Sequence, residues 1–231
     1  MPDFLIYSNL SAKMSLIADN ITKIRNKIAA LGAKTKLIAV SKNVEAQQIE
    51  EAIACGCTIF GENKVIEAKT KWLNLKNQYK NTQLHLIGHL QSNKAKDAVA
   101  IFDVIQTLDS IKLAKILQKE MTKQNKFPQI FAQINIGEET QKSGLMPQDA
   151  GNFIKKVEQE CGIKISGLMA IAPKDKEPSL YFALLKKIAD ENNIQNISMG
   201  MSQDFEKAIA FGSDFIRVGK AIFGTKIGSS K

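Results

Sequence analysis

The stretch LIAVSKNVEAQQIEEAIACGCTIF, residues 37–60, carries the pattern that decides the fold. It opens with a short apolar run at 37–41, continues through an amphipathic stretch of helical period at 45–54, and ends with a second apolar run at 58–60. A buried strand, a helix and another buried strand in this order are typical of a parallel βαβ unit. The pattern therefore predicts that this segment belongs to a parallel sheet.

The same alternation continues along the whole chain. Apolar runs occur at residues 37–41, 58–60, 84–87, 104–108, 130–135, 165–171, 196–199 and 215–218. Nearly all are followed by helical patterns, such as those at 45–54, 111–123, 147–160 and 180–192. Because eight parallel strands close a barrel, the sequence predicts an α/β fold, a single (β/α)8 TIM barrel. A doubly wound open sheet is the structural alternative.

A helical pattern at 12–31 precedes the first strand, so we expect an extra N-terminal helix. Its apolar stripe consists of Met14, Ile17, Ile21, Ile24, Ile28 and Leu31. No low-complexity linker or shift of composition divides the chain, and residues 1–231 are expected to form one domain.

Composition argues against several classes of protein. The net charge of +9 would suit a nucleic-acid surface, but lysines and acids are interleaved along the helical patterns, which favours solvated helix faces. We find no membrane-span or export pattern. The odd number of cysteines, Cys55, Cys57 and Cys161, favours free thiols in a reducing cytoplasm over disulfides or zinc. We therefore expect a cytoplasmic protein that binds neither a membrane nor a specific nucleic acid.

In a parallel barrel, functional groups lie where the strands end, because eight loops converge there. Lys42 directly follows the first predicted strand. Partial desolvation would favour its uncharged amine, which can form a Schiff base with an aldehyde or ketone. The alternative is that this strand-end lysine is exposed to solvent and has no function. Asn63, Asn135 and Met169 lie at or near other strand ends.

The loops after the seventh and eighth strands of a barrel commonly bind phosphate. Here they contain Ser198, Gly200, Ser202 and Gly219, and a helical pattern follows at 203–212. The same residues would also suit ordinary turns and a serine N-cap. No metal site is expected, because His85 and His89 bracket a strand and a turn and do not share a face.

Six segments together resemble one known family. They are LIAVSK at 37–42, FGEN at 60–63, HLIGHLQSNK at 85–94, GLM at 167–169, SMGMSQD at 198–204 and RVGKAIFG at 217–224. In this order they are similar to the YggS/PROSC family of pyridoxal 5'-phosphate (PLP) homeostasis proteins. The resemblance implies an alanine-racemase-type barrel without a second domain, and PLP as the cofactor.

The resemblance also assigns roles to residues. It implies that Lys42 holds PLP as a Schiff base, that Ser202 and the backbone at Gly219 and Lys220 bind the phosphate, and that Arg217 faces the pyridine nitrogen. At position 220 relatives often have a small hydroxyl residue. With Lys220 in this chain, the side-chain contact of that hydroxyl with the phosphate is either lost or replaced by a contact from the ammonium. Pocket-lining positions are matched by Asn63, Asn135 and Met169. The stretch 138–144, which contains Lys142, Ser143 and Gly144, matches a family loop after the fifth strand.

The implied function is intracellular PLP homeostasis without turnover. Tyr7, Tyr79 and Tyr181 are expected to lie away from the strand ends, so no tyrosine base is available. A charged Arg217 would keep the pyridine nitrogen unprotonated and the ring a poor electron sink. Alternatives are a racemase-like PLP enzyme, a Schiff-base aldolase using Lys42, and a binder of RNA or anionic surfaces. Expected partners are PLP and, as candidates, amino acids, with the chain a monomer or a weak homodimer.

Overall fold

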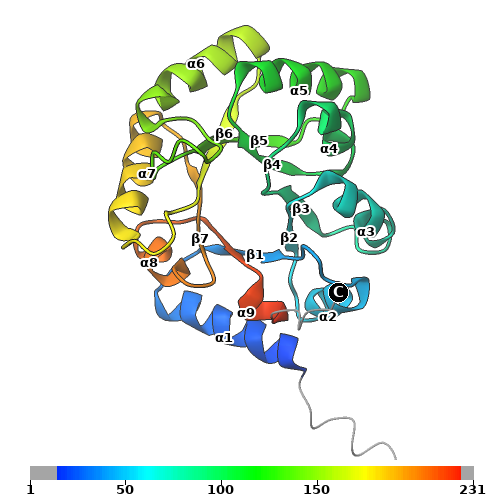
Figure 1. Ribbon diagram of the computed structural model, residues 1–231. Coiled ribbons are helices and arrows are strands. Elements are labelled where there is room, and N and C mark those ends of the chain that lie inside the picture. Colours follow the sequence, from blue (N-terminus) through cyan, green and yellow to red (C-terminus); the bar gives the residue numbers. More distant parts are fainter. Residues whose placement is uncertain (1–14, 225–231) are drawn as a thin grey trace, which may run out of the picture.

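The computed structural model describes residues 15–224, which form a closed barrel of eight parallel strands arranged in chain order (Figure 1). The barrel closes because β8 pairs with β1, which excludes the open-sheet alternative. The strands are β1 (Lys36–Val40), β2 (Ile59–Glu62), β3 (Gln83–Leu86), β4 (Val104–Leu108), β5 (Gln129–Ile134), β6 (Ile165–Ala170), β7 (Asn196–Met201) and β8 (Phe215–Val218).

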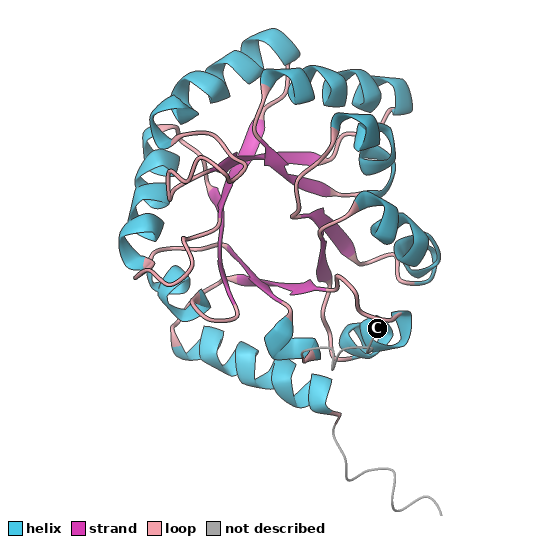
Figure 2. Cartoon of the chain, viewed as in Figure 1, coloured by secondary structure: helices cyan, strands magenta, loops and turns pink. Residues whose placement is uncertain are grey.

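Helices form an outer ring around the strands, as Figure 2 shows in cyan and magenta. They are α1 (Leu16–Ala30), α2 (Ala46–Ala54), α3 (Val65–Gln78), α4 (Ala95–Ile101), α5 (Ile111–Gln124), α6 (Ala150–Cys161), α7 (Ser179–Glu191), α8 (Phe205–Ala210) and α9 (Lys220–Phe223). Two short 3-10 turns, η2 (Ser92–Lys94) and η3 (Pro147–Asp149), precede α4 and α6. No helix among residues 15–224 is long and apolar enough to cross a membrane.

The predicted N-terminal helix is present as α1. The hydroxyl of Ser15 caps it by accepting a hydrogen bond from the Ala18 amide at 3.2 Å, and the isoleucine stripe at 17, 21, 24 and 28 is buried. Met14, the first member of the predicted stripe, lies outside the described residues. Helix α1 packs against α2, α8 and α9 along the outside of the ring (Figure 1), and so covers the seam where β8 meets β1.

Two apolar clusters stabilise the barrel. The larger one fills the space between the strands and the helices. The smaller one is contributed by five different strands and fills the barrel interior with Ile38, Ile59, Val104, Phe131 and Phe215. The rings of Phe131 and Phe215 meet edge to face, with centroids 6.0 Å apart. The interior is therefore packed at this level and leaves no open pore.

The predicted strands agree with the observed ones to within two residues at every boundary. One difference matters for the site: β7 runs to Met201, two residues beyond its predicted end. Ser198 was predicted at a strand end, and this placement is wrong. It lies inside β7 and is fully buried.

Candidate functional site

Four of the predicted site residues follow four neighbouring strands. Ser202, Gly219 and Asn63 come directly after β7, β8 and β2, and Lys42 is the second residue after β1. The strand registers bring these ends level, as the neighbouring pairs show: Met201 with Arg217, Val218 with Ala39, and Val40 with Gly61. The barrel therefore gathers these four residues into one arc of its rim, which we call the rim arc.

Lys42 lies in this arc with an exposed side chain. Its amine forms no hydrogen bond or ion pair with any residue between 15 and 224. The partial desolvation expected from the sequence is therefore not observed. The amine is instead free to meet a ligand at the rim.

The turn between β8 and α9 passes tightly against β1. A Cβ atom added to Gly219 would lie 3.1 Å from both the Val40 carbonyl oxygen and the Val40 Cβ. This close approach holds the backbone at Gly219 and Lys220 beside the segment that ends in Lys42. Lys220 itself is exposed and begins α9.

Ser202 lies in the turn between β7 and α8. That turn is closed by the Met201 amide, which donates to Asp204 Oδ1 at 2.6 Å. Within the described part of the chain, the Ser202 hydroxyl has no hydrogen-bond partner. Asn63 is held by a different contact: a Cβ at Gly88 would lie only 2.2 Å from the Asn63 carbonyl oxygen, so the loops after β2 and β3 touch there.

Arg217 lies below the rim arc, inside the barrel, with only 4% of its surface exposed. Its Nη1 donates to Ser198 Oγ and its Nη2 donates to the Ala170 carbonyl, each at 2.8 Å. Burial lowers the pKa of Arg217 to about 10, so the guanidinium stays charged at neutral pH. No carboxylate forms an ion pair with it among residues 15–224.

A chain of buried polar groups continues from Arg217 across the barrel. Ser198 Oγ donates to Gln106 Oε1 at 2.7 Å, and Gln106 Nε2 contacts His85 Nδ1 at 2.9 Å. Burial, followed by the charges of Lys36 and Lys76, lowers the pKa of His85 to about 3, so its ring is neutral. Since Nδ1 accepts from the amide of Gln106, the ring carries its proton on Nε2.

Sequence reasoning missed Gln106. The signal was available, because a glutamine in the middle of the apolar run VIQTL has no place in a purely hydrophobic core. Its partners could not be named in advance, since they lie on two other strands, 21 and 92 residues away in the chain.

Asn135 and Met169 are buried near the rim. The side chain of Asn135 braces the loop after β5, because its Nδ2 donates to the Glu139 carbonyl at 2.8 Å and its Oδ1 accepts from the Glu139 amide at 3.3 Å. Met169 lies beside Ser198 in the sheet. Met169 is therefore next to β7, whereas Asn135 follows β5, outside the rim arc, and its side chain is hydrogen-bonded to the loop.

The loop at 138–144 folds back over the strand ends. The Ser143 carbonyl accepts from Gln133 Nε2 at 3.2 Å, and the Gly144 amide donates to Asp109 Oδ2 at 3.3 Å. His89 lies next to it, exposed, with Nδ1 4.0 Å from Asp109 Oδ2. His85 and His89 therefore lie in different environments, one inside the barrel and one at its rim.

The described residues hold no metal centre, and a cavity found elsewhere in the barrel does not coincide with the rim arc. Residues 15–224 contain no group of three or more His, Cys, Asp or Glu side chains able to hold a metal ion. A cavity of about 560 Å³ is lined by Lys36, Ile59 and Gln83, the first residues of β1, β2 and β3. It therefore opens at the end of the barrel opposite to Lys42.

Comparisons with known proteins identify the family and the fold. Residues 13–226 match the family described as alanine racemase, N-terminal domain. A pyridoxal phosphate homeostasis protein of Haemophilus influenzae is 39% identical over 202 residues, which cover 83% of this chain and 85% of the relative. The structure of PipY from Synechococcus elongatus with PLP bound has a TM-score of 0.80 at 34% identity, covering 90% of this chain and 100% of PipY. An alanine racemase of Clostridium difficile, with a TM-score of 0.71 at 13% identity, shares the fold alone.

Proposed function

Because this chain belongs to the family of pyridoxal phosphate homeostasis proteins, within the alanine racemase N-terminal domain family, we propose that it binds PLP as a Schiff base on Lys42. The observation that carries this proposal is the rim arc. It places the free amine of Lys42 near the candidate phosphate donors at Ser202 and Gly219, above the buried guanidinium of Arg217. When bound, PLP supplies an aldehyde carbon, a phosphate and a pyridine ring. The residues of the arc fit the aldehyde and the phosphate, and Arg217 below the arc fits the pyridine ring.

Lys42 and the turns after β7 and β8 hold the two ends of the cofactor. The amine of Lys42 forms a bond to the aldehyde carbon, and the aldehyde oxygen leaves as water. The hydroxyl of Ser202 and the backbone N–H groups at Gly219 and Lys220 donate to the phosphate, to which the Lys220 ammonium adds a positive charge. The tight contact of Gly219 with Val40 supports this arrangement, because it keeps the donors close to Lys42.

Arg217 faces the pyridine nitrogen. Its fixed charge opposes protonation of that nitrogen, and Ser198 with the Ala170 carbonyl holds the guanidinium in place. Ser198 therefore acts through Arg217 and does not contact the phosphate. Asn63 and Met169 line the pocket, and Asn135 braces the loop beside it.

The protein holds PLP without turning over a substrate. Tyr79 is the C-cap of α3 and precedes β3, so it lies toward the end of the barrel where the strands begin, and Tyr181 packs against the core from α7; neither therefore supplies a base at Lys42. Tyr7 lies outside the described residues. Structural neighbours with the same fold include racemases and dehydratases, which makes a PLP enzyme the second candidate. The charge of Arg217 favours the carrier function.

The same proposal includes a cytoplasmic location, a single domain, and a monomeric or weakly dimeric state. Three free thiols suit a reducing compartment. Amino acids are the candidate partners for exchange. Lysines of the outer helices pair with acids one turn away, as Lys156 does with Glu160 and Lys187 with Glu191, which favours solvated faces over a nucleic-acid surface.

Lys42→Ala tests the assignment of the amine. The variant should stay folded, because an exposed side chain contributes little packing, and should lose the visible absorption band that PLP gives the wild type. Borohydride reduction and peptide mapping should place the pyridoxyl group on Lys42. The matched control is Lys64→Ala, which removes an exposed lysine that follows β2 and should keep the band. Label on another lysine would overturn the assignment.

Arg217→Glu tests the absence of turnover. A carboxylate facing the pyridine nitrogen would favour its protonation and make the ring a better electron sink. NMR should show almost no exchange of the α-proton of added amino acids with solvent in the wild type, and a measurable increase in the variant. Arg217→Met, which removes the charge without adding an acceptor, is the comparison. Rapid exchange in the wild type would favour the enzyme.

A further inference from the structure

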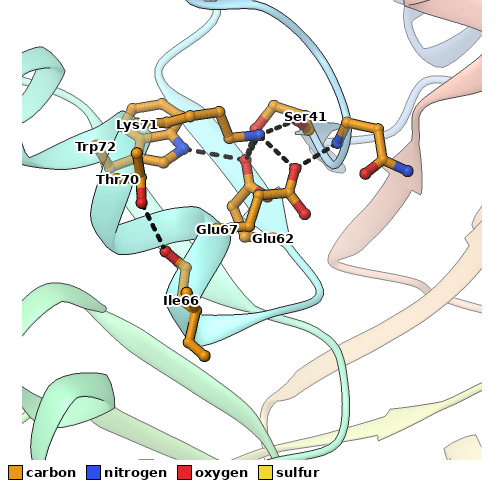
Figure 3. A network of polar contacts seen from close by, with 8 residues as sticks. Ser41, Glu62, Ile66, Glu67, Thr70, Lys71 and Trp72 are labelled. Atoms are coloured by element: carbon orange, nitrogen blue, oxygen red, sulfur yellow. Dashed lines mark hydrogen bonds and ion pairs between the residues drawn. The ribbon is translucent and has the colours of Figure 1, made fainter.

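A fully buried carboxylate lies one strand away from Lys42. Glu62, the last residue of β2, accepts hydrogen bonds at its Oε1 from Ser41 Oγ at 2.6 Å and from Trp72 Nε1 at 3.1 Å. The ammonium of Lys71 lies 2.9 Å from the same oxygen. Figure 3 shows these groups converging from β2, from α3 and from the segment after β1.

Lys71 joins this carboxylate to the backbone beside Lys42. Its Nζ donates to the Ser41 carbonyl at 2.6 Å and to Glu67 Oε1 at 2.8 Å. Glu67 Oε1 in turn accepts a hydrogen bond from the backbone N–H of Asn43. Burial opposes the charge on Glu67, but the bonds from Lys71 and Asn43 outweigh it, and the pKa of Glu67 is lowered.

The contacts hold the chain on both sides of Lys42 and leave Lys42 itself free. Ser41 is bound through its hydroxyl and its carbonyl, and Asn43 through its N–H. Asn43 has a positive φ of 55°, a left-handed conformation that asparagine tolerates better than most residues other than glycine, so the chain turns sharply here. The network therefore fixes the direction in which the chain leaves β1, and with it the point from which the Lys42 side chain starts.

Stability alone does not explain this network. Taking the charges of Lys71 and Glu62 out of water costs several kcal/mol per ion, and apolar residues of similar volume often stabilise a fold equally well. Glu62 Oε2 also lacks a hydrogen-bond partner among the described residues. Such a costly arrangement is expected where the position of a neighbouring group matters.

We propose that Lys71, together with Glu62 and Glu67, is a positioning device for Lys42, which sets the amine at the angle and depth from which it attacks the cofactor aldehyde. The inference rests on the proposed function of Lys42. Attack by a neutral amine requires the nitrogen to approach the carbonyl carbon along a narrow path, and a displacement of about 1 Å can cost about a hundredfold in rate. Lys71 acts through the backbone of Ser41 and Asn43 and does not touch the cofactor.

The chain offers a matched control on the same helix. Lys76 Nζ donates to the Ile101 carbonyl at 2.9 Å and to Asp103 at 2.7 Å, so it makes the same kinds of contact as Lys71. Its side chain is 26% exposed, against 15% for Lys71. Its partners precede β4 at the opposite end of the barrel. Lys76→Met therefore removes a comparable ion pair of α3 without loosening the neighbours of Lys42.

The experiment compares wild type, Lys71→Met, Lys71→Arg and Lys76→Met as cofactor-free proteins. Mixing with PLP in a stopped-flow spectrophotometer gives the rate constant for appearance of the Schiff-base band. We expect Lys71→Met to be slower by about tenfold or more, Lys71→Arg to recover most of the rate, and Lys76→Met to match wild type even where its melting temperature falls. Hydrogen exchange of the Asn43 amide, measured without PLP, should accelerate in Lys71→Met alone.

Glu67→Ala keeps the test decisive if Lys71→Met does not fold. Glu67 is partly exposed, and its removal takes away the acceptor of the Asn43 N–H while the Lys71 pair with Glu62 remains. In either variant, Glu67→Ala or Lys71→Met, the Asn43 amide could exchange faster while the Schiff base still forms at the wild-type rate. That result would overturn the positioning role and leave the proposed function intact. A wild type that forms no Schiff base on Lys42 would instead overturn the proposed function.

Discussion

His85 is a single residue whose ionisation depends on its place inside the barrel. Burial, followed by the charges of Lys36 and Lys76, lowers its pKa from the ordinary value of 6.5 to about 3. Between pH 6.5 and about pH 3, His85 is therefore protonated in the unfolded chain and neutral in the folded protein. Stability contributed by the neutral ring is fully present above pH 6.5 and is lost as the pH falls from 6.5 toward 3.

We expect this residue to make the protein sensitive to mild acid. Between about pH 7 and about pH 5, protonation of His85 in the unfolded chain alone should remove about 2 kcal/mol of unfolding free energy. His85→Gln keeps an amide next to Gln106 and removes the titration. Urea unfolding of both proteins at the two pH values checks this, since the carboxylates contribute equally to both. Equal losses in the two proteins would show that His85 is not the cause.

At the scale of an element, the turn from β7 to α8 depends on a glycine. Gly200 has a φ of +89°, and an added Cβ would lie 2.5 Å from Ala208 Cβ and 3.0 Å from Phe205 Cα. Helix α8 thus packs directly on the strand that leads to Ser202. Gly162, which ends α6, also has a positive φ, of +62°, but an added Cβ would meet nothing within 4 Å.

The two glycines separate backbone strain from steric overlap. Gly162→Ala should cost about 1 kcal/mol of unfolding free energy, the price of a left-handed residue. Gly200→Ala should cost more, about 2 to 5 kcal/mol, because overpacking adds to the strain and pushes α8 away from β7. Since Ser202 lies in the displaced turn, PLP should also bind more weakly to this variant alone. Urea unfolding and PLP titration measure both effects, and equal costs for the two variants would contradict the packing argument.

At the scale of the whole molecule, the ring of helices is completed by the start of the chain. Helix α9 is short, so α1 covers the seam between β8 and β1 and packs against α2, α8 and α9. Asn20 Nδ2 donates to the Ile222 carbonyl at 3.0 Å and ties the two ends of the described chain together. Pairing of β8 with β1 therefore closes the sheet, and α1 closes the ring of helices outside it.

Removing side chains from α1 should show how much this closure contributes. Ile21 is 1% exposed, and Ile21→Ala should lower the unfolding free energy by about 2 to 5 kcal/mol through lost burial and a cavity. Leu16→Ala, at a position of the same helix that is 69% exposed, should stay within about 0.5 kcal/mol of wild type. Urea unfolding provides both values. Similar small losses would mean that α1 is not part of the cooperative unit.

The sequence by itself determined the order of the elements and the residues at the strand ends. Apolar periodicity is a local property, so eight runs and their intervening helices could be recognised without knowing what packs against what. A parallel barrel places all strand ends at one face, and this rule predicted that Lys42, Asn63, Ser202 and Gly219 would meet. The amine of Lys42 was found in this way because Lys42 directly follows the predicted strand at 37–41.

Only the tertiary structure decided which side chains support these residues. His85, Gln106, Ser198 and Arg217 lie on four strands, and their contact depends on strand register and barrel stagger, which composition and period do not contain. Lys71 resembled any other lysine of an amphipathic helix until folding placed it beside the Ser41 carbonyl. Long-range polar contacts of this kind depend on how the elements pack against one another. The residues near each partner in the sequence therefore do not reveal them.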